Sequence, residues 1–165
     1  MNEQIIKDIM NLIESSSDCV ACSVDENGFP NAKVMFKAEN EGIRNIWFST
    51  NLSAIRTQLW LKNPKASVYF RNSNEFIGLN LTGRIRVHTD NETKQRFWKQ
   101  GDEQYYPLGV TDPDYCVLCF TTENGNCYKA GEKYTFSLGS NINLTTYKYD
   151  SKWIPELTIE QKINW

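Results

Sequence analysis

The sequence is poor in the features that most catalytic and nucleotide sites use. It has one histidine, His88, so a Ser-His-Asp or Cys-His site would depend on that residue alone. His88 lies in a strand-like stretch between Val87 and Thr89, and we interpret it as a surface residue near a strand end. Neither GxGxxG nor a P-loop motif occurs, which excludes the two common glycine-rich phosphate fingerprints.

Long apolar runs and excess charge are also missing. No stretch reaches the roughly 20 apolar residues of a membrane-spanning helix, and the first residues mix acids with apolar side chains, unlike a signal peptide. The formal net charge is −2, and no local basic patch stands out. We therefore expect a cytoplasmic protein that binds neither membranes nor nucleic acid.

The five cysteines include two CxxC pairs, Cys19/Cys22 and Cys116/Cys119, a spacing shared with zinc sites. Zinc knuckles usually carry Gly or Pro at the turn between the ligands, whereas both pairs lie in runs of strand-forming residues. In a strand, residues i and i+3 face opposite sides. We interpret these residues and Cys127 as buried thiols in a reducing compartment, and predict no metal site.

The periodicity of the chain predicts mostly strands. Apolar residues spaced by three and four predict a helix over residues 3–14, and Asn27-Gly28 predicts a hairpin between two apolar runs. Gly78 and Gly83 are expected to mark bulges or bends, and Asn124-Gly125 a second hairpin. Further strands are predicted at 43–50, 66–71, 76–88, 115–122 and 126–130, and short helices at 53–61 and 91–99, the latter opened by Asp90.

This order predicts a mainly β fold, in which six or seven antiparallel strands close into a barrel with flanking helices. The 165 residues suit one ordinary domain, and 13% of them are aromatic, which favours strands and surfaces for ring-shaped ligands. We place the barrel domain at residues 1–137 and expect residues 138–165 to be a C-terminal extension of uncertain structure.

One stretch has the composition of a phosphate cradle. In WFSTNLSAIR, residues 47–56, a strand gives way to a short helix that carries hydroxyl side chains and an arginine one turn in. Hydroxyls, N–H groups at a helix start and a guanidinium are the groups that bind a phosphate monoester. The same spacing also fits an ordinary N-cap at Ser53 with Arg56 on a solvated face, and spacing alone does not separate the two.

The run IWFSTNLSAIRTQLWLKNPKASVYF resembles the core signature of the pyridoxamine 5′-phosphate oxidase-like, FMN-binding split-barrel family, especially its small general-stress-protein branch. Trp98 with GDEQYYPLGVTDPDYCVLCF and Cys127-Tyr128 resembles the same branch, as do PNAKVMFK and LTGRIRV. The resemblance implies a split barrel that forms a homodimer and binds FMN between its subunits.

The resemblance also implies roles for individual residues. Lys33, Val34 and Met35 would lie along the isoalloxazine edge, and three aromatic residues would approach from the partner subunit. The residues implied for the phosphate and ribityl chain are Ser49, Thr50, Asn51, Ser53 and Arg56, and the aromatic residues are Trp98, Tyr105 and Tyr106.

The implied activity is a flavin-dependent oxidoreductase that passes hydride from a reduced nicotinamide through FMN to a small acceptor. True pyridoxamine 5′-phosphate oxidases carry an arginine-rich C-terminal motif, but this chain has no Arg after Arg96 and no His after His88, so we do not expect that activity. Two alternatives stay open: a flavin-binding or stress-response module without turnover, and a deazaflavin or haem in place of FMN.

Overall fold

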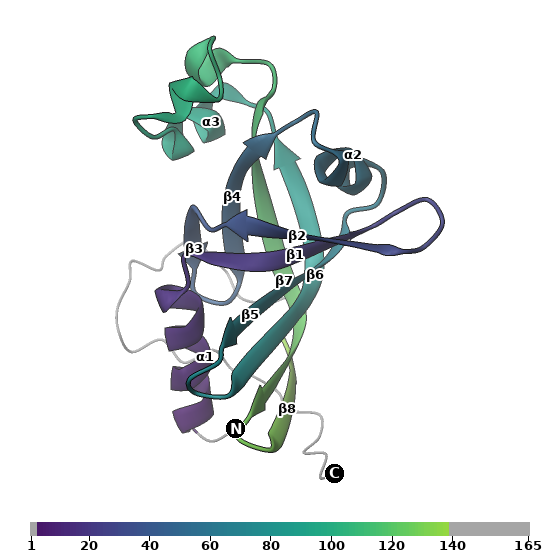
Figure 1. Cartoon of the computed structure of the whole chain (residues 1–165), viewed down its shortest axis with the longest axis vertical. Helices are drawn as coiled ribbons and strands as arrows, with labels where there is room; N and C mark the ends of the chain where they lie inside the picture. Colours follow the sequence, from purple (N-terminus) through teal and green to yellow (C-terminus); the bar gives the residue numbers. More distant parts are fainter. Residues whose placement is uncertain (1–2, 139–165) are drawn as a thin grey trace.

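Residues 3–138, the part of the chain that the computed structural model describes, form one curled antiparallel sheet with helices packed against it (Figure 1). The helices are α1 (Glu3–Ser15), α2 (Ile55–Lys62) and α3 (Asn91–Phe97), with short 3₁₀ turns η1 (Asp102–Gln104) and η2 (Gly109–Thr111). The strands are β1 (Asp18–Val24), β2 (Pro30–Phe36), β3 (Glu39–Glu41), β4 (Asn45–Asn51), β5 (Lys65–Asn72), β6 (Ile77–His88), β7 (Tyr115–Lys129) and β8 (Glu132–Ser137).

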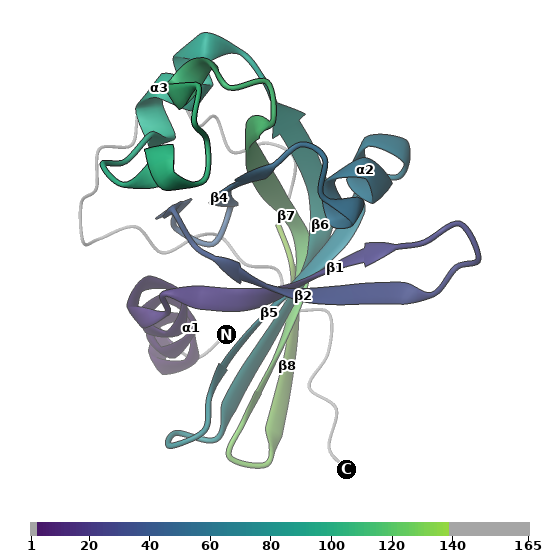
Figure 2. The ribbon, with the colours of Figure 1, turned by 45° about the horizontal axis from the view of Figure 1, so that its top comes forward.

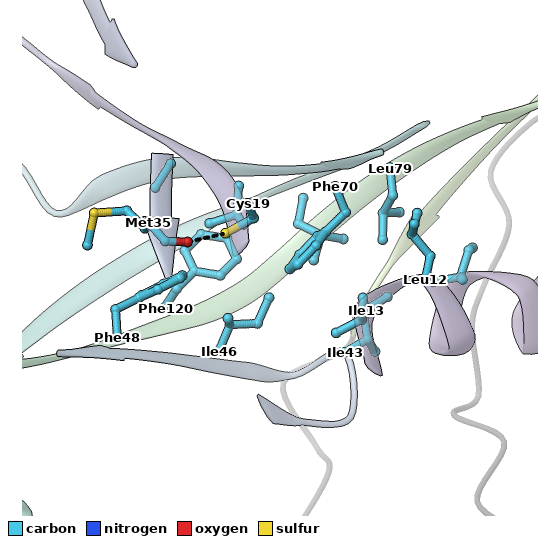
Figure 3. Close-up of a cluster of buried hydrophobic side chains, with 14 of the residues drawn as sticks. Leu12, Ile13, Cys19, Met35, Ile43, Ile46, Phe48, Phe70, Leu79 and Phe120 are labelled. Atoms are coloured by element: carbon cyan, nitrogen blue, oxygen red, sulfur yellow. Dashed lines mark hydrogen bonds between the residues drawn. The ribbon is translucent and has the colours of Figure 1, made fainter. Parts of the chain in front are cut away.

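The strand order is β2-β1-β5-β6-β7-β4-β3, with β8 paired to the second half of β7. The sheet curls so far that Met35 of β2 and Phe48 of β4, which lie near opposite ends of this order, face the same core (Figure 3). The predicted fold class, a mainly β antiparallel split barrel with flanking helices, is confirmed. Among the described residues no helix is long and apolar enough to cross a bilayer.

The inner face of the sheet forms the main core. Alternate residues of each strand point inward, which is the pattern expected of a sheet with one covered face, and α1 adds its apolar side (Figure 3). The fully buried members with the largest side chains include Trp60, Phe48, Phe70, Phe120, Ile9, Ile13, Ile43, Ile46, Leu79, Leu81 and Leu118.

A second, aromatic core lies on the other face of β4 and β7. It is covered by residues 90–114, which contain α3, η1 and η2 and which we call the arm; Figure 2 shows the arm as a lobe at one end of the sheet. Along β7, side chains alternate between the two cores, so this strand connects the barrel interior to the arm. The members of the second core are Trp47, Phe97, Tyr106, Tyr115, Val117 and Cys119.

Several local predictions are confirmed. The N-terminal helix is α1, and the first hairpin turns at Gly28 with φ of +86°. Asp90 is the N-cap of α3 and accepts a hydrogen bond from the Thr93 N–H at 2.9 Å. The register of β6 shifts between Thr82 and Gly83, where a Cβ would lie 2.0 Å from the carbonyl oxygen of Thr121, so glycine permits the close approach of two strands.

The predicted hairpin at Asn124-Gly125 is wrong, because β7 continues through both residues. A Cβ at Gly125 would lie 2.3 Å from the ring of Phe136, so this glycine makes room for a core aromatic rather than for a turn. The hairpin forms instead at Ala130-Gly131, where both φ angles are positive, and leads into β8. Eight strands result in the described part, because residues 115–129 form one strand, while residues 39–41 and 132–137 add two strands that were not predicted.

The remaining predictions concern cysteines, His88 and the C-terminus. Within each CxxC pair the thiols face opposite sides of the strand. Cys19 and Cys116 point into the barrel core, and Cys119 points into the second, aromatic core. Burial raises the pKa of Cys19 and of Cys116 to about 12. His88 ends β6, half-buried 5.5 Å from the Trp47 ring. The predicted C-terminal extension lies outside the described residues, except Leu138.

Candidate functional site

The turn from β4 into α2 leaves the start of the helix open. The N-cap is Ala54 rather than Ser53, and it makes no side-chain hydrogen bond to the first turn. Thr57, which is fully buried, fixes the helix by donating its hydroxyl to the backbone carbonyl of Asn51 at 2.9 Å. Within residues 3–138, no side chain therefore caps the N–H groups at the start of α2, beginning with that of Ile55, and they are available to a ligand.

Arg56 stands in this first turn with an incompletely used guanidinium. Its Nη2 donates to Oγ1 of Thr50, which is buried at the end of β4. Its Nε is buried and has no hydrogen-bond partner among residues 3–138, and no ion pair within that range includes Arg56. Buried N–H groups without a partner are uncommon, and a guanidinium at a helix start is a strong ligand for phosphate. The arrangement fits a missing anion.

Asn51 and Ser53 already donate hydrogen bonds to a carboxylate of the same chain, that of Asp114. Asn51 donates through Nδ2 at 2.8 Å, and Ser53 donates through its backbone N–H at 2.6 Å and its hydroxyl at 3.0 Å. These hydrogen bonds, that of Asn51 foremost, hold the pKa of Asp114 below its usual value. Asp114 was not predicted as a site residue, because it lies 61 residues from Ser53 along the chain and no local pattern connects the two.

Ser49 joins the cradle to the aromatic core. Its hydroxyl lies 3.2 Å from the hydroxyl of Tyr115, and the ring of Tyr115 packs against those of Tyr106 and Trp98, with centroids 4.8 and 5.2 Å away. Burial raises the pKa of Tyr106 and of Tyr115, so both stay protonated donors at neutral pH. Tyr106 is 6% exposed, whereas Tyr105 is 69% exposed. Lys94 supports this cluster by donating to the carbonyl of Asp112 at 2.7 Å.

The third part of the predicted site is the edge strand β2. Lys33 and Val34 are exposed, but the side chain of Met35 is buried in the barrel core beside Phe48 (Figure 3). Only the backbone of Met35 is therefore placed to meet a ligand. Phe36 is also exposed, at 78%, so Val34 and Phe36 give this edge strand two exposed apolar side chains beside the charged Lys33.

Apart from the residues of β2 and the exposed Tyr105, the predicted site residues fall into three groups. Thr50 and Arg56 form the open half of the cradle, and Asn51 and Ser53 form the half held by Asp114. Ser49, Trp98 and Tyr106 meet around Tyr115, a residue that the sequence analysis missed. No group of three or more potential metal ligands occurs within residues 3–138.

Comparison with known proteins identifies a family over most of the chain. The family model described as "pyridoxamine 5′-phosphate oxidase like" matches residues 4–150. No protein with a curated description matches the sequence. The match includes the whole barrel, the cradle and the arm.

Solved structures agree in fold. A Clostridium acetobutylicum protein related to general stress protein 26 is 39% identical, with a TM-score of 0.75 over 84% of this chain and 97% of that one. An FMN-binding, pyridoxamine 5′-phosphate oxidase-related protein from Nostoc punctiforme is 12% identical, with a TM-score of 0.65 over 99% and 96% of the two chains. A haem-binding protein from Mycobacterium smegmatis is 12% identical, with a TM-score of 0.63 over 80% of this chain and 57% of that one.

Proposed function

Since this chain belongs to the pyridoxamine 5′-phosphate oxidase-like family, we propose that it is an FMN-binding oxidoreductase of the cytoplasm that works as a homodimer. One observation carries the cofactor assignment: the half-buried guanidinium of Arg56, whose Nε has no partner among the described residues, lies in the uncapped first turn of α2. A phosphate monoester supplies the anion that this turn lacks. The similar fold of the FMN-binding protein from Nostoc punctiforme supports FMN as the molecule that carries this phosphate.

The chain's own residues bind and orient this cofactor. Arg56, oriented by Thr50, and the N–H groups at the start of α2 hold the phosphate. The paired hydroxyls of Ser49 and Tyr115 would offer a donor to the ribityl chain, and the backbone of β2 would lie along the ring. When bound, FMN supplies the redox chemistry, accepting hydride from a reduced nicotinamide and reducing a small acceptor.

The outer face of the sheet supports a homodimer. Val34, Val20 and Tyr69 lie in one cross-strand row on β2, β1 and β5, and Val34 and Tyr69 are 63% and 41% exposed. Phe36 extends the row along β2. A contiguous apolar patch on a sheet face is typical of a protein interface. Trp98 and Tyr105 of the arm are proposed to approach the flavin of the partner subunit.

Replacing Val34 and Phe36 together by Asp tests the dimer. The double variant is expected to sediment as a monomer and to lose FMN affinity, since the proposed site lies between subunits. Phe76→Lys, which changes a similarly exposed apolar residue in the β5–β6 turn, is the control and should stay dimeric. A V34D/F36D variant that sediments like the wild type would contradict this interface.

A second function, a flavin-binding module without turnover, is favoured by one observation. Around the cradle, the carboxylate of Asp114 is already held by Asn51 and Ser53, and the other described side chains are hydrogen-bond donors and aromatic rings. The half-buried His88 contacts Trp47 and Asp90 instead. Steady-state oxidation of NADH or NADPH with a broad panel of acceptors separates the two functions. No turnover by FMN-loaded protein with any acceptor would leave the binding module as the function.

The cofactor assignment is tested by titrating wild type and Arg56→Ala with FMN and following flavin fluorescence. Loss of the charged phosphate ligand should weaken FMN binding by about 1.5 to 3 kcal/mol, and Arg56→Lys should recover part of it. Arg84→Ala, which removes an exposed arginine paired with Glu123, should bind like the wild type. Equal affinity of wild type and R56A for FMN would mean that the cradle is misassigned. If the protein binds haem or a deazaflavin and not FMN, the assignment of FMN as the cofactor is wrong.

A further inference from the structure

The carboxylate of Asp114 occupies three of the donors that a phosphate in the cradle would use. Its two oxygens accept hydrogen bonds from Asn51 Nδ2, from the Ser53 N–H and from the Ser53 hydroxyl, at 2.6 to 3.0 Å. These donors belong to the turn that leads into α2, so an anion held by Arg56 and the start of the helix lies close to a negative charge. The cradle therefore combines an attractive half and a repulsive half.

The main chain at Asp114 is held by hydrogen bonds that do not involve its carboxylate. The backbone carbonyl of Asp114 accepts from the Leu52 N–H at 2.6 Å, and its N–H donates to Asp112 Oδ1 at 2.9 Å, so the main chain is fixed independently of the side chain. An asparagine at 114 can accept from the Ser53 N–H through its oxygen. Its NH₂ group can donate to the Ser53 hydroxyl and to a rotated Asn51 amide, because both of these groups also accept hydrogen bonds.

We propose that Asp114 is a specificity-determining residue that limits how strongly the cradle prefers a phosphorylated flavin over an unphosphorylated one. The carboxylate confines the phosphate to Arg56 and the first turn of α2, and repels it. Riboflavin, which has no phosphate, is not affected by this charge. The inference rests on the proposed function, since it concerns the same site.

The test compares the dissociation constants of FMN and riboflavin for wild type and Asp114→Asn, by fluorescence titration at low ionic strength. Two like unit charges about 4 Å apart in a water-like medium repel each other, and this repulsion weakens binding by roughly fivefold. D114N should therefore bind FMN about fivefold more tightly than the wild type does, and its affinity for riboflavin should equal that of the wild type. The gain should shrink at about 1 M salt, where the Debye length falls to about 3 Å.

Two further variants complete the test. Glu75→Gln removes the same charge from the β5–β6 turn, at the other end of the sheet from α2, and should leave the FMN-to-riboflavin preference as in the wild type (Figure 1). Asp114→Ser neutralises the cradle with a smaller acceptor and has to raise the preference in the same direction. Thermal unfolding shows whether each variant is folded. If D114N is not folded, the FMN-to-riboflavin preference of D114S is the test of the proposal.

Each outcome is decisive. A preference for FMN that rises in D114N or D114S, and falls back with salt, supports the proposal. An unchanged preference, or weaker FMN binding by folded variants, overturns it and leaves Asp114 as a structural clamp. In either of those cases the wild type still binds FMN, whereas a wild type that binds neither flavin overturns the proposed function as well.

Discussion

Helices α1 and α2 both pack against the curled sheet, yet they satisfy their polar groups to very different degrees. At the C-terminal end of α1, Lys37 Nζ donates to the backbone carbonyls of Ile13 and Glu14, and the Ser16 hydroxyl donates to the carbonyl of Leu12 at 2.6 Å. The apolar face of the helix is buried in the barrel core. The C-terminal carbonyls and the apolar face of α1 therefore both have partners.

Helix α2 is left open. It begins without a side-chain cap, and three buried polar side-chain atoms in residues 3–138 lack a partner: Arg56 Nε, Trp60 Nε1 and Ser23 Oγ. Two of them belong to α2, and Ser23 belongs to β1, against which α2 packs. Unsatisfied buried groups reduce stability, so their concentration at one helix supports the proposal that a ligand binds at this end of the sheet.

The largest effect is expected from α1. Ile13 is fully buried, so Ile13→Ala should lower the free energy of unfolding by about 2 to 5 kcal/mol. Urea unfolding measures this change. Ile55→Ala in α2, where the side chain is 73% exposed, should stay within about 0.5 kcal/mol of the wild type. Similar losses in the two variants would contradict the contrast between the helices.

Adding FMN should protect the N–H groups at the start of α2 from exchange and leave those of α1 unchanged. At an FMN concentration of about 100 times Kd, the free energy of unfolding should rise by about 2.7 kcal/mol. Hydrogen exchange should slow most at the amides of Ile55, Arg56 and Thr57. Protection spread equally over α1 and α2 would show that the flavin does not bind at the start of α2.

A smaller effect is expected at the C-terminal end of α1. Lys37→Met keeps much of the side chain but removes the donor to two helix carbonyls, and should reduce stability by about 1 kcal/mol. Lys62→Met at the end of α2 removes only an exposed ion pair with Glu26 and should change stability by less than that. Thermal unfolding at equal protein concentration measures both. If K62M reduces stability more than K37M does, the hydrogen bonds at the C-terminal end of α1 do not contribute as proposed.

The smallest effect should have the opposite sign. The Ser23 hydroxyl is buried without a partner, so Ser23→Ala should leave stability unchanged or raise it by about 0.5 kcal/mol. Thr122→Val is the matched comparison, because the equally buried Thr122 hydroxyl donates to the Ile43 carbonyl at 2.7 Å and its loss should destabilise by about 1 kcal/mol. A clear loss in S23A would reveal an ordered water on Ser23.

Features encoded by short sequence spacings could be predicted well. The helix at residues 3–15, the turn at Gly28 and the cap at Asp90 each depend on residues within a few positions of one another. The contact between Thr50 and Arg56 is local for the same reason, since both lie within one strand-to-helix turn, whereas their role in binding phosphate stays a prediction. Local chemistry determines these elements.

Features that depend on distant residues could not be predicted. Asn124-Gly125 has the sequence of a hairpin turn, but Leu81 and Phe136 pack over Gly125 and favour a continuous strand. Asp114 contacts the cradle from a position about sixty residues away along the chain, so no spacing rule associates it with Ser53. Which donors of the cradle remain free could only be read from the structure.

Binding of FMN at the start of α2 is the central claim, and the visible absorption spectrum of freshly purified protein tests it most directly. The predicted result is the absorption of oxidised flavin, retained through gel filtration or restored by added FMN, at one flavin per chain. A colourless protein that neither gains this absorption nor quenches the fluorescence of added FMN would contradict the account.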